Sequence, residues 1–251
     1  MNRIGVMVNE VAFANLPIIF KNAGYDFMIL DCEHGSFDFM QTASMIMVAK
    51  LIKLPVIVRI AQCLRKDVTR YMDMGADGIL LAMTSSPEQI AEVIRYAKYA
   101  PIGKRGISTM RAHTLYNPPP LQTYMKIANE NTFMYAQIET LEGVKKAAEI
   151  AEIDGVDGVL FGPNDYSCDA GKIGDAKSIY AAIREVAQKV TFCGKRAGII
   201  TGNKNYLSVA ADSGMTMFSV SSELSLLSEA ADINLRTNRE YLNVEKITRE
   251  N

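Results

Sequence analysis

Acidic and imidazole side chains stand close together directly after an apolar run near the start of the sequence. Asp31 and His34 follow the run Phe27–Leu30 and are three residues apart. A carboxylate at that spacing can orient an imidazole and stabilise its protonated form, so the pair is typical of a group that moves protons. A hydrogen-bonded structural histidine is the alternative for His34. The other histidine, His113, lies in a long loop, and two histidines are too few for a histidine-rich metal site.

Two further acids follow other apolar runs. Glu139 comes directly after Phe133–Ile138, and Asp165 comes soon after Gly158–Phe161. Two carboxylates, together with water and a chelating substrate, form the hard oxygen site that Mg²⁺ or Mn²⁺ prefers. Glu139 could instead cap the following helix, and Asp165 could form an Asx turn with its neighbour. The sequence therefore predicts Glu139 and Asp165 as metal ligands, with these structural roles as the alternatives.

A guanidinium group, that of Arg59, also follows an apolar run. It follows Pro55-Val56-Ile57-Val58, so we expect it to emerge from a buried strand. An arginine there needs an anionic partner, because burying an unpaired charge is costly. A structural ion pair satisfies that need. The functional interpretation is that the guanidinium stabilises an oxyanion that develops during a reaction.

These side chains need a scaffold that brings the ends of several apolar runs together. Short apolar runs, which are typical of buried parallel strands, alternate along the chain with longer amphipathic stretches. Strands are expected at Ile4–Val8, Phe27–Leu30, Pro55–Ile60, Gly78–Ala82, Phe133–Ile138, Gly158–Phe161, Ala197–Ile200 and Met217–Val220. Helices are expected over 13–22, 37–51, 65–74, 87–98, 124–128, 141–151, 176–190 and 204–213, followed by a long helix from 223.

Eight strand–helix units over 251 residues predict an α/β protein, namely a (β/α)8 TIM barrel that forms a single domain over 1–251. A doubly wound open sheet is the alternative, although no Pro/Gly/Ser-rich boundary divides the chain. In a barrel, chemistry lies at the C-terminal ends of the strands, which is where the side chains above are found. Glycines before strands, such as Gly24 and Gly75, are expected to end the preceding helices.

Composition excludes several classes of function. The chain carries 27 basic and 28 acidic residues without a charge block, so nothing favours nucleic acid or an anionic membrane as a partner. No apolar run reaches the ~18 residues of a membrane span, and the N-terminus lacks the layout of a signal peptide. The four cysteines show no CxxC spacing, which favours a reduced, cytoplasmic location. No lysine follows an expected strand, which disfavours a Schiff-base aldolase, and no glycine-rich nucleotide motif is present.

The chain resembles the HpcH/HpaI family of metal-dependent class II aldolases. No single stretch carries the resemblance, which rests on several short motifs that occur in order along nearly the whole chain. They are DCEHG at Asp31–Gly35, VR at Val58–Arg59, MDMGADG at Met72–Gly78, GKRG at Gly103–Gly106, QIET at Gln137–Thr140, VDGVLFGPNDYS at Val156–Ser167 and AGI at Ala197–Ile199.

The resemblance implies a barrel that forms or cleaves carbon–carbon bonds through the enolate of a 2-oxo acid, pyruvate or oxaloacetate. It implies that the divalent metal held by Glu139 and Asp165 chelates this substrate, and that Arg59 stabilises the enolate. His34 would be the acid/base, with Asp31 orienting it and Asp73 raising its basicity. The substrate carboxylate would bind near Gln137 and at the backbone amides around Asn164 and Asp165.

The resemblance also implies a homo-oligomer, a hexamer built as a trimer of dimers. Members of the family often exchange their last helix between neighbouring subunits, so 223–251 is a possible swapped element. The resemblance leaves the acceptor open, because Asn9-Glu10, Leu81-Ala82-Met83, Asn164 and Tyr166 depart from the family's usual residues on that side of the mouth.

Three functions therefore stay open. The first is an aldolase that releases pyruvate from a 4-hydroxy-2-oxo acid, with an aldehyde as the acceptor. The alternative is a synthase that joins oxaloacetate to acetyl-CoA and forms citrate, as in siderophore-associated relatives. A non-catalytic barrel that only binds a 2-oxo acid is the third, and the presence of His34, Arg59, Glu139 and Asp165 argues against it.

Overall fold

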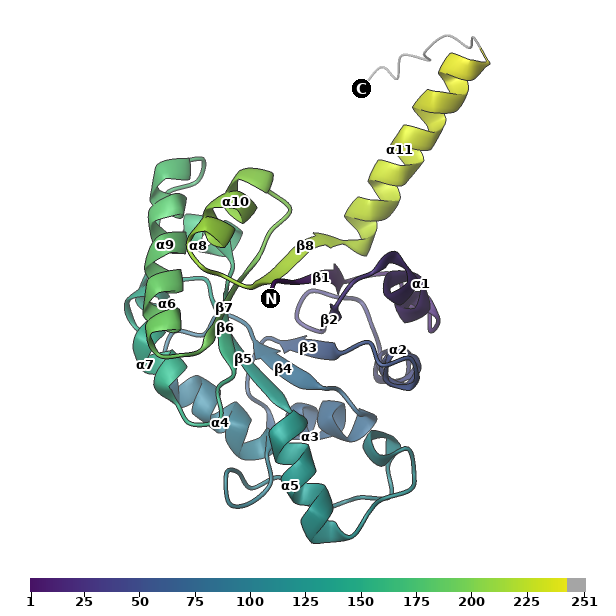
Figure 1. Ribbon diagram of the computed structural model, residues 1–251, viewed down its shortest axis with the longest axis vertical. Helices are drawn as coiled ribbons and strands as arrows, with labels where there is room; N and C mark the ends of the chain where they lie inside the picture. The colour runs from purple at the N-terminus through teal and green to yellow at the C-terminus, as the bar shows by residue number, and fades with distance from the viewer. Residues whose placement is uncertain (243–251) are drawn as a thin grey trace.

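Eight parallel strands close into a barrel in the computed structural model, which describes residues 1–242 (Figure 1). Each strand pairs with the next along the chain, and the last pairs with the first. The predicted (β/α)8 barrel is thus confirmed, and the open sheet is excluded. The strands are β1 Arg3–Val8, β2 Phe27–Asp31, β3 Val56–Ile60, β4 Gly78–Leu81, β5 Phe133–Ile138, β6 Gly158–Phe161, β7 Arg196–Ile200 and β8 Met217–Ser222.

Helices follow the strands and cover the outside of the barrel (Figure 1). The expected helix over 141–151 is two short helices, and a helix that the sequence did not predict follows β6. The helices are α1 Leu16–Ala23, α2 Phe39–Leu51, α3 Arg65–Met74, α4 Pro87–Ala97, the 3-10 turn η1 Ala112–Thr114, α5 Leu121–Asn131, α6 Leu141–Lys145, α7 Ala147–Glu152, α8 Pro163–Asp169, α9 Ala176–Phe192, α10 Lys204–Asp212 and α11 Glu223–Tyr241.

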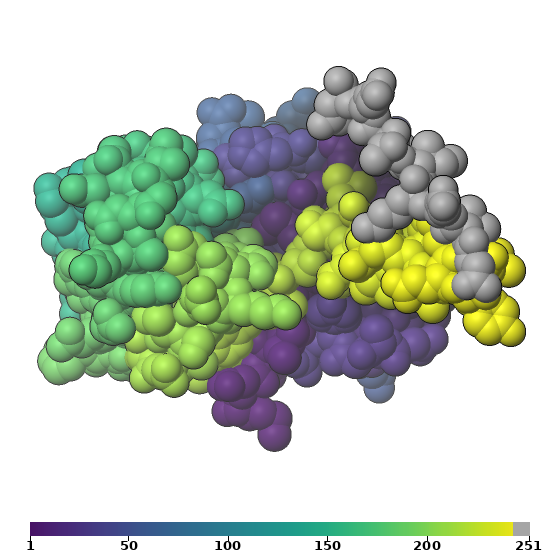
Figure 2. Space-filling view, turned by 90° about the horizontal axis from the view of Figure 1, so that it is seen from above, coloured from purple at the N-terminus to yellow at the C-terminus, as the bar shows by residue number. Residues whose placement is uncertain are grey.

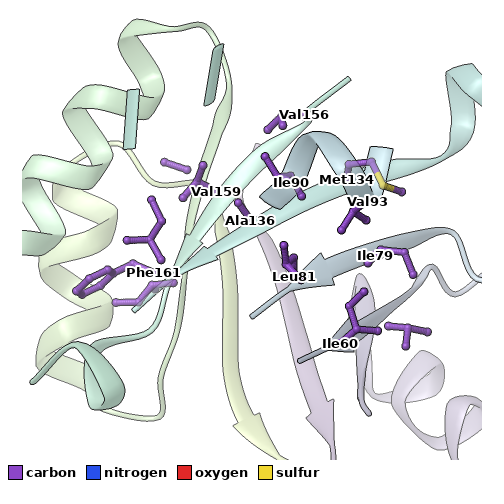
Figure 3. Packing of buried hydrophobic residues seen from close by; sticks show 14 of the residues in the cluster. Ile60, Ile79, Leu81, Ile90, Val93, Met134, Ala136, Val156, Val159 and Phe161 are labelled. Carbon is purple, nitrogen blue, oxygen red and sulfur yellow. The ribbon is translucent and has the colours of Figure 1, made fainter. Parts of the chain in front are cut away.

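Apolar side chains fill both faces of the strands. One set, which includes Ile29, Leu80 and Leu160, points into the barrel and fills it below the mouth. The alternate set, which includes Ile79 and Met134, packs outward against the helices (Figure 3). Successive strand residues face opposite sides, so a buried parallel strand must be apolar throughout. This is why the sequence shows continuous apolar runs, and why polar side chains stand out where the runs end.

Three aspartates at strand starts fix the lower end of the barrel. Asp26, Asp77 and Asp157 stand directly before β2, β4 and β6, and each accepts a hydrogen bond from a backbone N–H of the preceding strand. These N–H groups belong to Ile4, Val56 and Met134, at 2.8, 2.9 and 2.8 Å. Each carboxylate therefore holds two neighbouring strands in register at the end opposite the mouth. Gly24 and Gly75 end α1 and α3 in the left-handed conformation, as predicted.

The last helix, α11, does not lie against the barrel like the other helices. It projects away from the end of β8 (Figure 1), and it stands out at one side of the molecule in the space-filling view (Figure 2). Its main contacts are with β1 and β8, and Leu227, Ile233 and Leu235 are exposed along it. The predicted swapped element 223–251 includes this helix, and its last nine residues lie outside the described part of the chain.

No helix in residues 1–242 is both long enough and apolar enough to cross a membrane.

Candidate active site at the mouth of the barrel

Arg59 lies inside the mouth, where it is held by a carboxylate from the neighbouring strand. Its Nε and Nη2 donate to the two carboxylate oxygens of Asp31 at 2.9 and 2.6 Å, and Asp31 is fully buried. Burial favours the neutral form of Asp31, but the hydrogen bonds and charge of Arg59 outweigh it and lower the pKa of Asp31. The remaining nitrogen, Nη1, lies 3.4 Å from Oε2 of Glu33. Arg59 is therefore a fixed cation with one edge free of Asp31.

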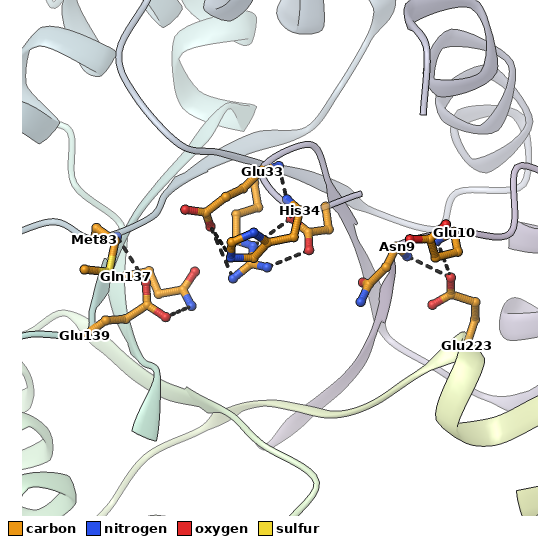
Figure 4. Close-up of polar contacts among 10 residues, drawn as sticks. Asn9, Glu10, Glu33, His34, Met83, Gln137, Glu139 and Glu223 are labelled. Carbon is orange, nitrogen blue, oxygen red and sulfur yellow. Dashed lines mark hydrogen bonds and ion pairs between the residues drawn. The ribbon is translucent and has the colours of Figure 1, made fainter. Parts of the chain in front are cut away.

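His34 lies at the rim of the mouth, and its position corrects one expectation. The carboxylate of Asp31 accepts the backbone N–H groups of Glu33 and His34, so it shapes the turn that carries the histidine. Its hydrogen bonds go to Arg59 and to these backbone groups, and none goes to the imidazole. The carboxylate near the ring is Glu33, whose Oε2 is 4.0 Å from Nε2 of His34 (Figure 4). The His34 side chain is 70% exposed and free to meet a ligand.

Glu139 directly follows β5 at the mouth, and both its carboxylate oxygens are hydrogen bonded (Figure 4). Oε1 accepts from the side-chain amide of Gln137 at 2.6 Å, and Oε2 accepts from the backbone N–H of Met83 at 3.1 Å. Burial, the largest cause, and the negative charges of Asp165 and Glu33 raise the pKa of Glu139 to about 7, although the Met83 hydrogen bond and Arg59 act in the opposite direction. The arrangement is thus a buried carboxyl group that lacks a cation strong enough to keep it fully ionised.

A glycine at the end of β6 leaves room for the Glu139 carboxylate, and polar residues lie around it. A Cβ on Gly162 would collide with the Glu139 carboxylate, so only glycine fits at this end of β6. Asn164 and Asp165 follow in the first turn of α8 and are exposed. Gln137 is 1% exposed, and the oxygen of its side-chain amide, Oε1, is buried without a hydrogen-bond partner. An unpartnered buried oxygen beside an acid pair is typical of a site that receives a ligand.

Asp73 does not belong to this group within the chain, contrary to the expectation that it raises the basicity of His34. It is the second-last residue of α3, the helix that runs from the mouth back to the start of β4. Its carboxylate oxygen Oδ1 is 2.7 Å from Nη2 of Arg105 and 3.7 Å from Nδ1 of His113. Asp73 therefore lies a helix length from the mouth, in a second cluster at the opposite end of the barrel.

Sequence reasoning missed three groups that shape the mouth. Glu33 stands inside the DCEHG motif, and that position was the available signal for it. Glu223, at the start of α11, accepts backbone N–H groups from the loop after β1, and no local pattern marks it. The backbone N–H of Met83 reaches Glu139 because Met83 has a positive φ of 48°. A methionine in the sequence does not indicate a backbone with positive φ.

Charge converges at the mouth from four strand ends. The negative charges of Asp31, Glu33 and Glu139 raise the pKa of Arg59, and the charge of Asp165 raises the pKa of Glu139. Three carboxyl groups therefore face one guanidinium, and a fourth, Asp165, faces Glu139. Among residues 1–242 no group of three or more His, Cys, Asp or Glu side chains is arranged to hold a metal ion. A cation here would take two protein carboxylates and fill its other positions with water or substrate, as the sequence predicts.

Comparison with known proteins identifies the family of the chain. The family model described as HpcH/HpaI aldolase/citrate lyase matches residues 10–230. A hydroxypyruvate/pyruvate aldolase of Delftia acidovorans is 31% identical over 220 residues, which are 86% of this chain and 81% of that protein. The crystal structure of an HpcH/HpaI aldolase from Desulfitobacterium hafniense superposes with a TM-score of 0.89 at 30% identity, covering 95% of this chain and 93% of that one.

The citrate synthase SbnG has the same fold, with a TM-score of 0.85 at 22% identity over 96% of this chain and 95% of that one. At this identity the likeness concerns the fold alone. The family match, by contrast, covers most of the chain and includes every strand end described above except that of β1. The chain with the Asp31–Arg59 pair and the Glu139–Asp165 acids at its mouth therefore belongs to the HpcH/HpaI aldolase/citrate lyase family.

Proposed function

We propose that this chain, an aldolase-type carbon–carbon lyase by its family, works with a divalent cation, Mg²⁺ or Mn²⁺, on the enolate of pyruvate or oxaloacetate. The observation that carries the proposal is the buried Glu139, which faces Asp165 and whose pKa is raised to about 7. Such a pair lacks positive charge, and Arg59 across the mouth is already paired with Asp31. A hard cation supplies the missing charge.

The residues present fit such a cation. Glu139 and Asp165 offer hard oxygen donors, which Mg²⁺ and Mn²⁺ prefer over nitrogen or sulfur. Gln137 and the Met83 amide fix the Glu139 carboxylate from behind by hydrogen bonding, as outer partners of metal ligands do. A bound divalent cation would polarise the 2-oxo group of the substrate and offset the negative charge of the enolate.

The chain's own groups have separate tasks in this proposal. Arg59 stays charged because Asp31 holds it, and its Nη1 edge is available to donate to an anionic enolate oxygen. His34 moves the proton at the rim, with the Glu33 carboxylate nearby to stabilise its protonated form. The exposed first turn of α8, at Asn164 and Asp165, receives the substrate carboxylate, with Gln137 beside it. Asp73 has no part within a single chain, because it contacts Arg105 instead.

A citrate-forming synthase is the second candidate, and one observation favours it. A cavity of about 540 Å³ lies beside the mouth between the ends of β7 and β8, and Asn164, Lys204 and Ser219 are among the residues that line it. It offers room, hydroxyl groups, one lysine and one glutamate, Glu229, to an acceptor larger than a simple aldehyde. Release of free CoA from oxaloacetate and acetyl-CoA, measured beside pyruvate release from 4-hydroxy-2-oxo acids, separates the two reactions.

We also propose that the chain acts as a homo-oligomer, with a hexamer as the expected assembly. The exposed side chains of Leu227, Ile233 and Leu235 on α11 support this, because a projecting helix leaves apolar surface that a second copy of the chain would cover. The four cysteines are unpaired thiols, which agrees with the predicted cytoplasmic location.

Exchange of the methyl protons of pyruvate in D₂O tests the proposed function. We expect chelator-treated protein to exchange them only after Mg²⁺ or Mn²⁺ is added. Glu139→Gln and Asp165→Asn should lose both the exchange and the binding of Mn²⁺ in a direct titration, because each substitution removes an anionic ligand. Glu185→Gln removes a carboxylate from the exposed face of α9 and should change neither. Exchange that survives without metal, or an absence of exchange with metal, contradicts the proposal.

A further inference from the structure

Glu223, the first residue of α11, makes an unusual set of contacts for a helix-terminal acid. It is 4% exposed, and its Oε1 accepts the backbone N–H groups of Asn9, Glu10 and Val11 at 2.8, 2.6 and 3.1 Å (Figure 4). One carboxylate oxygen thus gathers three consecutive amides of the loop after β1. Hydrogen bonds to a charged acceptor are about twice as strong as neutral ones, so this contact fixes the loop firmly.

The same loop holds the turn that carries His34. The backbone carbonyl of Asn9 accepts the N–H of Ser36 at 3.0 Å, and the carboxylate of Glu10 accepts the Ser36 hydroxyl at 2.8 Å. Gly35 lies between these contacts and Asp31 so tightly that a Cβ would collide with the carbonyl oxygens of Asp31 and Asn9. Ser36 is two residues after His34. The position of the histidine therefore depends on where the loop after β1 lies.

The seating of α11 depends on the same contacts. The helix begins directly at the end of β8, where Ser222 caps its first turn, and it then projects away from the barrel. Its main contacts are with β1 and β8. Glu223 is its one buried residue, and this side chain links the first turn of the helix to the loop after β1. A change in the direction of α11 would move this carboxylate first.

We propose that Glu223 is a positioning residue for the aldolase reaction, and that it ties the seating of the C-terminal helix to the placement of His34. This inference rests on the proposed function, since it concerns the same proton transfer. The path runs from Glu223 through the amides of residues 9–11 to Ser36, and from there to His34. Activity then depends on how α11 is held at Glu223.

Glu223→Ala tests the inference through a split between turnover and binding. Misplacing a catalytic group by about 1 Å can cost ~10²-fold in rate, so we expect kcat and the exchange of pyruvate protons to fall at least tenfold. The KM for pyruvate and the affinity for Mn²⁺ should stay within threefold, because Arg59 lies in β3 and Glu139 directly follows β5. Glu223→Gln keeps an oxygen acceptor and should lose less. It also serves as the test variant if the alanine variant does not fold.

A second experiment tests the path itself. Ser36→Ala should slow proton exchange in the same way, and the double variant with Glu223→Ala should be no slower than the slower single variant, because both break one chain of contacts. Glu240→Gln removes an exposed acid further along α11 and should match the wild type. Effects of Ser36→Ala and Glu223→Ala that simply multiply, or a Glu223 variant that loses only melting temperature, would overturn the inference.

The two proposals fail in different ways. If the wild-type protein with Mn²⁺ does not exchange pyruvate protons, the proposed function is wrong. If the wild type exchanges them and the Glu223 variants do so at the same rate, the proposed function stands and Glu223 has no positioning role.

Discussion

Two aspartate–arginine pairs, each with a buried guanidinium, lie at opposite ends of the barrel. At the mouth, Asp31 bonds Arg59 through two oxygens at 2.6 and 2.9 Å. At the other end, Asp73 bonds Arg105 at 2.7 Å, and the ring of His113 stacks on Tyr124 beside the pair. The guanidinium is similarly secluded in both, since the Arg59 and Arg105 side chains are 8% and 2% exposed. Geometry and burial alone do not tell a working site from a structural one.

The charge around each pair does tell them apart. Arg59 at the mouth faces Glu33 and Glu139 besides its partner Asp31, so negative charge is in excess. Arg105 faces one carboxylate, and burial together with the Arg105 charge lowers the pKa of its other neighbour, His113, to about 4. One guanidinium thus faces one carboxylate in the lower cluster, whereas carboxylates outnumber the guanidinium at the mouth. Unbalanced buried charge points to a site that binds something.

The largest effect is expected for the histidine at the mouth. His34→Ala should keep the binding of a 2-oxo acid within a few-fold and lose carbon–carbon bond turnover by ~10²–10⁴, the usual range for general acid/base catalysis. Binding and kcat should be measured on the same variant. Weakened binding with unchanged kcat would show that His34 only positions substrate.

The two arginines should differ in what their loss affects. Arg59→Lys should lower kcat by ~10²–10³, as for the loss of one oxyanion donor, because a point charge does not replace a planar guanidinium. Arg105→Lys should instead lower the free energy of unfolding by ~1–3 kcal/mol, since it disturbs a buried charged hydrogen bond. Steady-state kinetics and urea unfolding check the pair. An Arg59→Lys enzyme within threefold of wild type would remove the proposed role on the enolate.

The mouth should destabilise the metal-free protein as pH rises. The pKa of Glu139 is raised in the folded state from 4.5 to about 7, so the stability that its protonated form contributes is present below pH 4.5 and is lost by pH 7. The loss is about 3 kcal/mol at 1.36 kcal/mol per pH unit. Unfolding of chelator-treated protein across this range measures it. Glu139→Gln should make the free energy of unfolding independent of pH in this range. A wild-type protein without this pH dependence would contradict the excess of negative charge at the mouth.

The lower cluster should behave in the opposite sense. The pKa of His113 is lowered in the folded state from 6.5 to about 4, so its stability contribution is present above pH 6.5 and is lost as pH falls to 4. The upper limit is again about 3 kcal/mol. His113→Phe keeps a ring for the stack on Tyr124 and should remove this pH dependence, whereas the exposed His34 serves as the control. If the stability of the wild type and of His113→Phe depends on pH in the same way, the lower cluster does not keep His113 neutral.

The fold was predictable because the strands are short and buried on both faces. Runs such as Phe27–Leu30 and Phe133–Ile138 must be apolar throughout, so the polar residues that follow them mark the mouth. The acids Glu139 and Asp165 were found in this way, and the structure brings their charges together. Helix α8 was missed because Pro163 and Asn164 are turn residues in sequence and become helical only beneath the end of β6.

The partners of the site residues were less predictable, because they come from distant strands. Asp31 has His34 three residues away and Arg59 twenty-eight residues away, and sequence spacing favours the near one. The register of β2 on β3 sets Asp31 directly beside Arg59, which decides the contact. Asp73 was assigned from its motif alone, which gives no information on which end of the barrel the helix residue occupies, and within the chain it contacts Arg105. Local patterns identify reactive side chains, whereas strand register decides what they touch.

The aspartates at the strand starts have a consequence for how the molecule could be divided. Asp26, Asp77 and Asp157 each bond an amide of the strand just before their own, so the bonds join β1 with β2, β3 with β4, and β5 with β6. A chain opened in the exposed loop between β4 and β5, near Gly106, would leave every one of these bonds within a single fragment. The barrel is thus constructed from paired units, and half-barrels split at that loop are the natural pieces for reassembly or circular permutation.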